Sequence, residues 1–484
     1  MLEETKERHK RTCCELRWHV YEVLGERKID CLELETSTET KEEHIGGTSN
    51  RERIPQDRRW NMKKWYSLID KIYQPENLTK AFKRVKRNHG APGIDGETVE
   101  DFNVELEKNI EFLHGKLKTN TYEPSPVKRV EIEKPNGGKR LLGIPTVRDR
   151  VVQQAIVNII EGIFDKDFHP SSYGYRPGKS QHKAVAKAEK FLNTYNLTYV
   201  VDMDLSKCFD TLNHNIIMRE VSAKVSDGRV LKLIEKFLEA GVMKDGSFSE
   251  TELGSPQGGV ISPLLSNIYL NIFDQKMKEK GIRIVRYADD ILIFARNKAD
   301  AGNYLSYAQK ILEEELKLIV NEEKTTLTNV SKGVAFLGFV IFPHYVTIHP
   351  KRLKRFKDKI RRITKRNCGI PIEVVIRLLN PVLRGWMNYY RAANIKSICK
   401  ETMAWIKRRL RMLRMKQWKT YKKMHKEMRR KGIAGNGEKM DVRRWKNSKV
   451  HIIHMLLPNK YFQELGLIDI TTYDVGVLSS FYAG

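Results

Sequence analysis

The sequence has few cysteines and lacks the cysteine spacings that hold a structural zinc ion. Its six cysteines are Cys13, Cys14, Cys31, Cys208, Cys368 and Cys399. No two of them form a Cys-X-X-Cys pair, so neither a zinc site nor a disulfide framework is expected. The longest apolar run, around Val334–Phe342, is much shorter than the ~20 residues that span a bilayer. The first residues are acidic and have no apolar core, unlike a secretory signal. We therefore expect a soluble, cytosolic protein that does not contact a membrane.

Positive charge is abundant and unevenly distributed. Among 484 residues, 88 are Lys or Arg and 60 are Asp or Glu, which gives a net charge of +28 at pH 7. Residues 351–450, here called the basic block, contain 33 Lys and Arg against 6 Asp and Glu, so +27 of the total lies there. A solvated helical face is the plain alternative. So many cations with so few acids are more typical of a surface that neutralises phosphates, and the block predicts a polyanionic partner.

Composition and hydrophobic pattern divide the chain into four parts. Residues 1–59 form an N-terminal extension, 60–350 alternate helices and strands, 351–430 are helical and basic, and 431–484 form a C-terminal region. Helices are expected at 61–88, 97–117, after 146, 214–224, 229–240, 263–280 and 299–315. Strands are expected at 127–133, 139–144, 199–205, 284–287, 291–295, 334–342 and 345–349, the last two as a hairpin.

An apolar stripe runs through the basic block. Ile406, Leu410, Leu413, Tyr421, Met424 and Met428 recur at spacings of three and four residues, with one polar gap at Gln417. This pattern predicts one amphipathic, very basic helix.

Acidic residues lie at the ends of two predicted strands. Asp289 and Asp290 lie at a tight turn between two apolar strands, and Asp202 and Asp204 close another apolar strand. A solvated hairpin tip would explain the first pair taken alone. Three carboxylates from two neighbouring strands would instead provide the ligands of a two-metal site, where Mg²⁺ activates a primer 3′-hydroxyl and stabilises a leaving pyrophosphate.

Several motifs resemble those of one known family. Tyr287-Ala288-Asp289-Asp290 resembles the palm motif of reverse transcriptases, and GSPQGGVISPLLSN at 254–267 resembles group II intron-encoded reverse transcriptase/maturases. The same family's order is followed by GAPGIDG (90–96), KPNGGKRLLGIPTVRDR (134–150), SYGYRPG (172–178), FLGF (336–339) and LNPVLRGWMNYYR (379–391). The resemblance implies an α+β right-hand polymerase, with fingers and palm around an antiparallel catalytic sheet, followed by an α-helical thumb or maturase domain.

The resemblance also implies roles for individual residues in catalysis. Asp204, Asp289 and Asp290 are the expected catalytic and metal-binding acids, holding two Mg²⁺ ions, with Mn²⁺ as a possible substitute. In this family an aromatic residue follows the first metal-binding Asp by five positions, and Phe209 stands in that relation to Asp204. Asp202 is then a supporting residue on the same face. Phe209 would exclude a 2′-hydroxyl and favour dNTPs, and an ordinary core position is its alternative.

The nucleotide triphosphate needs cations beyond the metals. Lys134 and Arg140 flank a glycine turn that would place both over the phosphates, with Lys139 as a substitute for either. Gln257 corresponds to a glutamine that contacts the nucleotide in related polymerases. Lys324 resembles the family's motif-D lysine and would donate a proton to pyrophosphate. A solvated position is the alternative for each cation.

The thumb motif combines cations with aromatic rings. Arg384, Tyr389, Tyr390 and Arg391 are candidates for contact with nucleic acid, since this mixture suits backbone tracking and stacking. The rings could equally be core residues of a helical bundle, which is the preferred interpretation of Trp386. The C-terminal region resembles the DNA-binding portion of some members, and the cysteine and histidine spacing of an HNH endonuclease does not occur after Cys399.

The resemblance implies an RNA-directed DNA polymerase that uses dNTPs on an RNA template/DNA primer duplex, in the bacterial cytoplasm or nucleoid. It further implies a maturase that binds a group II intron RNA, assists its splicing and copies it into a DNA target by target-primed reverse transcription. Two alternatives stay open. One is a free-standing bacterial reverse transcriptase in host defence or repair, and the other is a polymerase-fold RNA chaperone that has lost synthesis. The intact acids argue against the second.

Overall fold

The computed structural model describes residues 64–133, 139–244, 247–249, 254, 258–433 and 440–482, and only the backbone at 139, 140, 244 and 247–249. Contacts divide the chain into Met1–Asn61 and Met62–Gly484, and all described residues belong to the second unit. Within them, no helix combines the length and the apolar character needed to cross a membrane.

The first described region contains helices around a small sheet. Its helices are α2 (Ile69–Ile72), α3 (Pro75–Arg87), α4 (Val99–Val104), α5 (Leu106–Lys118) and α6 (Val147–Asp165). The single helices expected at 61–88 and 97–117 are therefore wrong in detail. Pro75 starts a new helix after Gln74 leaves the helical conformation, and Glu105 interrupts the second helix. Proline suits the first turn of a helix because its missing N–H has no partner there.

The strands expected at 127–133 and 139–144 are confirmed residue for residue. Strands β1 (Val127–Glu133) and β2 (Lys139–Ile144) pair antiparallel, from Lys128 opposite Ile144 to Glu133 opposite Lys139. The sheet continues with β4 (Val242–Lys244), parallel to β1, and β5 (Ser247–Ser249), so its order is β2-β1-β4-β5. The sequence did not predict β4 and β5.

A four-stranded antiparallel sheet carries the acidic motifs. Its order is β6-β7-β3-β8, with β6 at Arg283–Tyr287, β7 at Asp290–Ala295, β3 at Tyr199–Met203 and β8 at Thr326–Asn329. Strand β3 lies between β7 and β8, with Asp202 opposite Leu292 on one side and Thr326 on the other. The α+β class and the antiparallel sheet are thus as predicted, although β8 was not expected.

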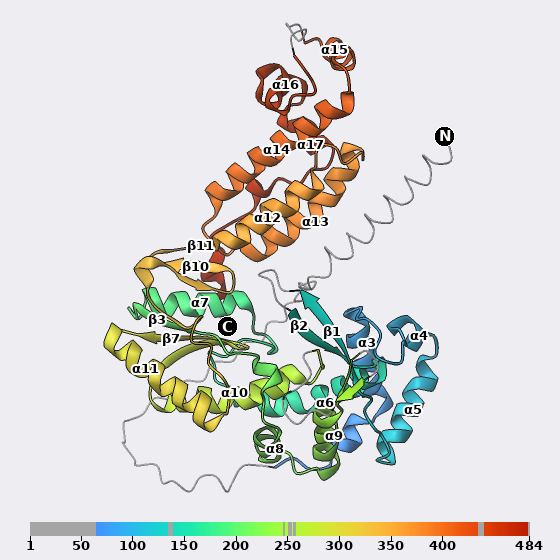
Figure 1. Ribbon diagram of the computed structural model, residues 1–484, viewed down its shortest axis with the longest axis vertical. Helices are drawn as coiled ribbons and strands as arrows, with labels where there is room; N and C mark the ends of the chain where they lie inside the picture. The colour runs from blue at the N-terminus through green and yellow to red at the C-terminus, as the bar shows by residue number, and fades with distance from the viewer. Residues whose placement is uncertain are drawn as a thin grey trace, which may run out of the picture. The chain divides into compact units, whose positions relative to one another are not determined.

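Alternating side chains give this sheet two buried faces. Val201 and Met203 of β3 belong to one apolar core, and Val200 belongs to another. The first face is covered by α10 (Ser262–Glu279) and α11 (Lys298–Lys310), and the second by α7 (Gln181–Asn193) (Figure 1). Helices α8 (His214–Ser222) and α9 (Gly228–Glu239) complete the first core. Because side chains alternate along a strand, Asp202 shares the face of Val200.

The hairpin expected at 334–349 is a three-stranded sheet instead. Strands β9 (Val334–Phe336), β10 (Phe339–Phe342) and β11 (Tyr345–Ile348) form it, with β10 in the centre. The chain reverses between β9 and β10 through Leu337 and Gly338, both with positive φ. A glycine adopts this conformation without strain, and it divides what the apolar pattern suggested was one long strand.

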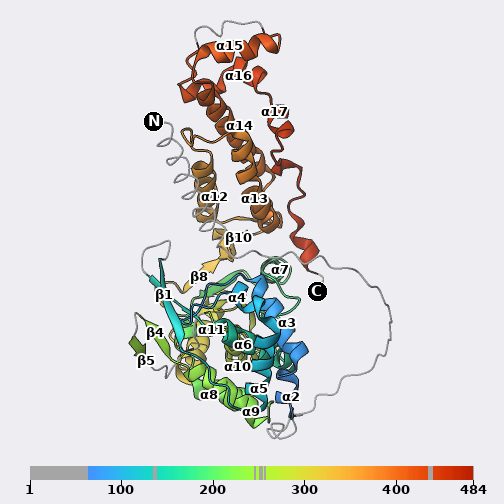
Figure 2. The same cartoon turned by 90° about the vertical axis from the view of Figure 1, so that its right-hand side faces the viewer.

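Helices and short turns follow residue 349. They are α12 (Pro350–Ile363), α13 (Ile372–Tyr390), α14 (Lys396–Trp418), α15 (Tyr421–Arg430), η6 (Trp445–Lys449), α16 (His451–Leu456), α17 (Asn459–Glu464), η7 (Ile470–Thr472) and η8 (Val477–Phe481). The single stripe helix expected across 406–428 is wrong: α14 ends at Trp418, Lys419 has a φ of 62°, and α15 restarts at Tyr421. Figure 2 shows α14 with α16 and α17 beside it.

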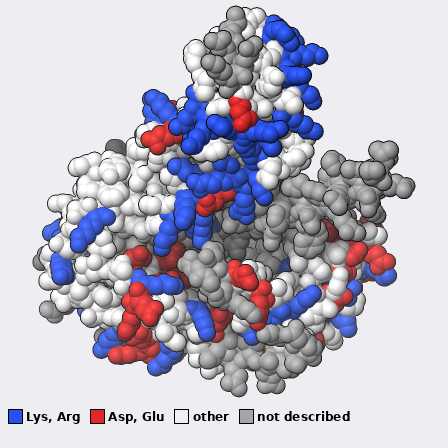
Figure 3. Space-filling model, turned by 45° about the horizontal axis from the view of Figure 1, so that its top comes forward, with Lys and Arg blue, Asp and Glu red and all other residues white. Residues whose placement is uncertain are grey.

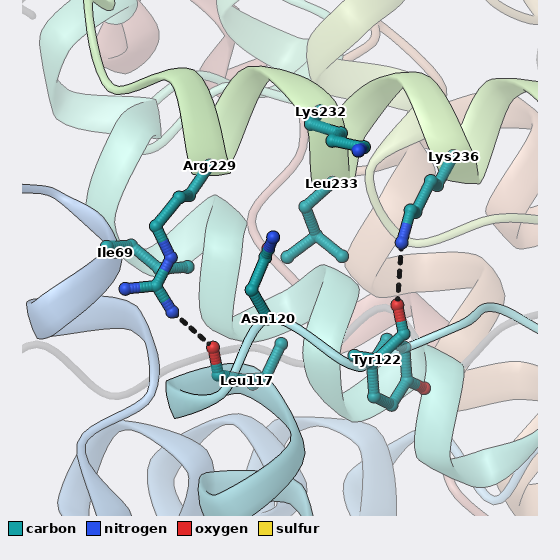
Figure 4. A pocket seen from close by; sticks show the side chains of 8 residues that line it. All are labelled: Ile69, Leu117, Asn120, Tyr122, Arg229, Lys232, Leu233 and Lys236. Atoms are coloured by element: carbon teal, nitrogen blue, oxygen red, sulfur yellow. Dashed lines mark hydrogen bonds between the residues drawn. The ribbon is translucent and has the colours of Figure 1, made fainter.

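A small cavity lies beside α9. It has a volume of about 10 Å³, close to that of a single water probe. Arg229 donates to the Leu117 carbonyl at 2.7 Å and Lys236 to the Tyr122 carbonyl at 3.3 Å (Figure 4). These cations cap neighbouring backbone groups, and the cavity is a packing feature rather than a ligand site.

Candidate active site and nucleic-acid interface

The acidic residues lie at one end of the antiparallel sheet. Asp204 follows the last residue of β3, and Asp289 lies in the two-residue turn between β6 and β7. Asp290 begins β7, opposite Tyr287. Strands β3 and β7 are direct neighbours, which is why acids from two distant motifs come together.

The pKa values of two of these carboxyls are raised, in part by the charges of the neighbouring acids. Burial and then the negative charges of Asp289, Asp202 and Asp204 raise the pKa of Asp290 to about 7. Burial and then the charge of Asp204 raise the pKa of Asp202 to about 6. Each of these carboxyls holds its proton unusually tightly, first because it is buried and then because its neighbours are also acidic. A bound cation would relieve that repulsion, and oxygen ligands are those that Mg²⁺ prefers.

One cation already faces this group. The Lys324 ammonium lies 2.5 Å from Asp204 Oδ2, and its side chain is 65% exposed. The Asn321 amide N–H bonds to the Asp204 carbonyl at 2.9 Å, so the two segments run side by side. Within the described ranges, no group of three or more His, Cys, Asp or Glu side chains has a geometry suited to holding a metal ion. The ion pair with Lys324 neutralises part of the acidic charge around Asp204.

A fully buried arginine anchors the turn that carries Asp289. Arg286, on β6, forms a bidentate ion pair with Asp274 of α10 at 2.6–3.0 Å, and both side chains are 0% exposed. Its Nη1 also donates to the Ala288 carbonyl and to Asn267 Oδ1, each at 3.0 Å. Bidentate, charge-assisted hydrogen bonds are strong, and they also fix the orientation of the two side chains. The turn is thereby tied to helix α10.

A second segment packs directly against the same turn. Asn267 Nδ2 donates to the Gly174 carbonyl at 2.8 Å. A Cβ at Gly174 would lie 2.3 Å from the Ala288 nitrogen, so the glycine is required for close approach. Ala288 itself has a φ of 58°, a region in which non-glycine residues are uncommon. Contacts from two sides hold this conformation in place.

Sequence reasoning did not identify this anchor. The sequence pattern assigns no role to Arg286 or to Asp274. The available signal was an acid inside the apolar stretch of the predicted helix at 263–280. Such a residue needs a buried partner, but the sequence does not say which one.

Gly254 lies against the turn that contains Phe209. Phe209 is half-buried in the short turn Cys208–Asp210, and a Cβ at Gly254 would lie 2.7 Å from the Asp210 carbonyl oxygen. A Cβ at Gly258 would lie 2.1 Å from the Gly143 carbonyl oxygen of β2. Gly254 and Gly258 therefore each lie too close to another part of the backbone for a side chain to fit. Lys134 and Gln257 lie outside the described residues, as do the side chains of Lys139 and Arg140.

The thumb candidates separate into exposed cations and packed rings. Arg384 and Arg391 are exposed. Tyr390 is only 8% exposed, and Tyr389 donates from its hydroxyl to the Leu337 carbonyl at 2.8 Å. Both rings contact the Phe339 ring, with centroids 5.2–5.4 Å apart. The rings join α13 to β10; Tyr390 is buried and Tyr389 half-buried, whereas both arginines are exposed.

Trp386 also packs in the interior, as the sequence favoured. It is 7% exposed and stacks on Phe356 of α12, with ring centroids 4.2 Å apart and an interplanar angle of 6°. Around this core, Lys and Arg gather over the helices that follow residue 350 (Figure 3). On α15, for example, Lys422, Lys423 and Lys426 are all exposed.

Comparisons with known proteins assign the two main regions. Residues 132–341 match the family described as reverse transcriptase (RNA-dependent DNA polymerase), and residues 353–432 match the group II intron, maturase-specific domain. The chain is 36% identical over 310 residues to Protein YkfC of Escherichia coli strain K12, which covers 56% of this chain and 81% of that protein. The chain belongs to the group II intron-encoded reverse transcriptase and maturase family. Its enzymatic class is RNA-directed DNA polymerase.

Other members of the family match over shorter shares of their length. The group II intron-encoded protein LtrA of Lactococcus lactis subsp. cremoris is 28% identical over 399 residues, covering 68% of this chain and 64% of LtrA. The putative COX1/OXI3 intron 2 protein of Saccharomyces cerevisiae is 27% identical over 366 residues, covering 63% of this chain and 42% of that protein. The chain thus spans slightly under two thirds of LtrA.

Family membership carries two broad consequences. Reverse transcriptases normally use divalent metal ions. A group II maturase domain joined to a reverse transcriptase implies nucleic-acid partners, including an intron RNA.

Proposed function

We propose that this protein copies RNA into DNA by adding dNMP from dNTPs to a primer 3′ end on an RNA template. The acidic end of the β6-β7-β3-β8 sheet is the observation that supports this best. Asp204, Asp289 and Asp290 supply hard oxygen ligands. Burial and then the neighbouring negative charges raise the pKa of Asp290, and a cation would balance those charges.

Two Mg²⁺ ions held by these acids, with Mn²⁺ as a substitute, would activate the primer hydroxyl and stabilise the pyrophosphate charge. Lys324 supplies a cation beside Asp204 and a proton at Nζ for the leaving pyrophosphate. Phe209 packs against the deoxyribose and disfavours a 2′-hydroxyl. Lys134, Arg140 and Gln257 bind the triphosphate from the fingers side.

Primer extension on an RNA template tests the assignment of the acids. Asp204→Asn and Asp289→Asn each remove a charge without changing side-chain size. Each should lower the extension rate by more than about 100-fold, as losing a charge-stabilising group at an active site does. Glu314→Gln, at an exposed acid beyond α11, is the matched control and should keep the wild-type rate. Wild-type extension by Asp289→Asn would show that the acids are not the catalytic centre.

We propose further that the protein is a maturase whose basic block binds a group II intron RNA. Most of the block, residues 353–432, matches the maturase-specific domain. In this proposal residues 60–350 are fingers and palm, 351–430 the thumb and maturase domain, 431–484 a DNA-binding region, and 1–59 an extension. Arg384 and Arg391 contact the template–primer duplex, and a DNA target primes the copying of the intron.

Salt dependence of RNA binding tests the role of the block. Lys422, Lys423 and Lys426 on α15 are exposed, and reversing all three to Glu should weaken binding and flatten the log K–log salt slope by about two units. The control reverses Lys298, Lys310 and Lys317, which are exposed on or near α11 on the opposite face of the sheet from Asp202. Equal effects of the two sets would contradict a localised RNA-binding surface. Co-purification of the wild type with one structured intron RNA separates a maturase from a free-standing reverse transcriptase.

A further inference from the structure

A basic cavity lies between α14 and the C-terminal turns. It has a volume of about 510 Å³, within the range of small-molecule and nucleotide sites. One face of α14 supplies Lys400, Met403, Ala404, Lys407, Arg408 and Arg411, and later elements supply Lys449, His454, Asn459 and Thr471. No Asp or Glu is among these lining residues. The cavity is therefore suited to an anion larger than a single phosphate.

Two cations in the wall are held by the protein itself. Lys407 Nζ lies 2.9 Å from Asp469 Oδ2, and both side chains are at most 15% exposed. Arg411, which is 3% exposed, donates to the Leu457 carbonyl and to Asn459 Oδ1, each at 2.9 Å. These bonds join α14 to the C-terminal region. Asp469 balances only one of the positive charges in the wall.

The remaining cations are available to a ligand. Lys400 and Lys449 are exposed, and among the described residues neither has an acidic partner. Arg408 lies over the Trp445 ring, 4.9 Å from its centroid, and Trp445 is 48% exposed. An exposed indole beside unpaired cations is the combination used to bind single-stranded nucleic acids, where phosphates meet the cations and an unpaired base stacks on the ring.

We propose that this cavity binds one unpaired segment of a nucleic-acid strand, with its phosphates on Lys400, Arg408 and Lys449. A base would stack on Trp445, which does not line the cavity but adjoins its wall at Arg408. The inference rests on the proposed function only in that the protein handles nucleic acid. It deepens that function by naming a single strand, rather than a duplex, as the occupant. In a duplex the Watson–Crick edge of a base is occupied and its ring faces are stacked, whereas an unpaired base can present both to a concave site.

The test measures binding, without dNTPs and with EDTA, so that it does not depend on catalysis. Fluorescence anisotropy follows labelled 12-nucleotide RNA and DNA single strands and a DNA duplex of the same sequence. The probe variants are Lys400→Ala/Lys449→Ala and Trp445→Ala. The control, Lys396→Ala/Lys446→Ala, removes two exposed cations from the same elements, α14 and η6, that do not line the cavity.

The expected results separate the two contributions. The lysine pair should weaken binding of both single strands and flatten the salt slope by about 1.4 units. Trp445→Ala should weaken it at least about fivefold, and Trp445→Phe should restore much of the loss. Duplex binding should change no more than in the control.

Cavity variants that match the control, or that weaken single strands and duplex alike, would overturn the proposal. If the wild type extends primers but the cavity variants bind single strands as well as the wild type does, the proposal for the cavity is refuted and the proposed polymerase function is not. If the wild type has no polymerase activity but the cavity variants still weaken single-strand binding, only the proposed polymerase function is refuted.

Discussion

The buried pair between Arg286 and Asp274 offers a sharp test of how the turn at Asp289 is positioned. Asp274→Asn keeps the shape of the side chain but removes its charge. Among the described residues, Asp274 is the only charged partner that the structure gives to the fully buried Arg286 guanidinium. Breaking a buried ion pair by neutralising one partner typically costs about 3–5 kcal/mol. That is a large share of the roughly 5–15 kcal/mol that stabilises a domain. Urea denaturation followed by circular dichroism measures the loss in the free energy of unfolding.

A surface pair provides the comparison. Asp358 and Arg361 form an ion pair on α12 with side chains 45% and 50% exposed. Asp358→Asn should change the free energy of unfolding by less than about 1 kcal/mol, because exposed pairs are screened by solvent. The contrast between the two Asp→Asn variants isolates the effect of burial.

The double variant Asp274→Leu/Arg286→Met separates stability from positioning. Apolar replacement of both partners should recover part of the lost free energy, since no unpaired charge is left in the interior. The Ala288 carbonyl and Asn267 would still lack their donor. We therefore expect slow primer extension and a higher Mg²⁺ concentration for half-maximal rate, in a protein that is folded.

Two outcomes would refute this reasoning. One is an Asp274→Asn variant as stable as the wild type within about 1 kcal/mol. The other is a double variant that regains both the wild-type rate and the wild-type Mg²⁺ dependence, because the turn would then not need the arginine.

Three further predictions address other parts of the molecule. Phe209→Val should raise the rate of extension with rNTPs relative to dNTPs, measured in single-nucleotide addition, and an unchanged ratio would assign the ring to packing alone. Gly174→Ala should lower the melting temperature and slow extension, because its Cβ would lie 2.3 Å from the Ala288 nitrogen. At Asp469, burial alone would raise the carboxyl pKa, but hydrogen bonds from Thr471 and Lys407 hold it below the usual 3.8. The carboxylate therefore stabilises the fold above pH 3.8 and less below it, so the melting temperatures of wild type and Asp469→Asn should differ at pH 7 and converge as the pH falls below 3.8.

Local patterns were sufficient for the strongly periodic elements. Strands β1 and β2 have the predicted boundaries because each is a strand-like run on one side of the sequence Pro-Asn-Gly-Gly, which predicts a turn. The acids also lie on neighbouring strands as expected, since the mostly apolar run of β3 is followed by Asp204 and that of β7 begins at Asp290. Strand β8, with the sequence TLTN, was missed because its polar residues give no apolar period. It is a strand because β3 offers it a free edge.

Burial decided what periodicity left open. The stripe at 406–428 kept its spacing across residues 419–420, yet the helix breaks there, and Tyr421 is 50% exposed. The aromatic rings of the thumb suited either stacking on nucleic acid or packing in a core. Packing against Phe339 and Phe356 resolved this for Tyr389, Tyr390 and Trp386.

Residue identity and short spacing were enough to indicate the family, the α+β class, the acidic motif and the concentration of positive charge in one hundred residues. Three pairings could be known only from the folded chain: Arg286 with Asp274, Lys324 with Asp204, and the cations of α14 with Lys449 around one cavity. Each of these pairs joins elements that lie apart in the chain, and the partner of a charge is set by which elements pack together, not by its neighbours in sequence.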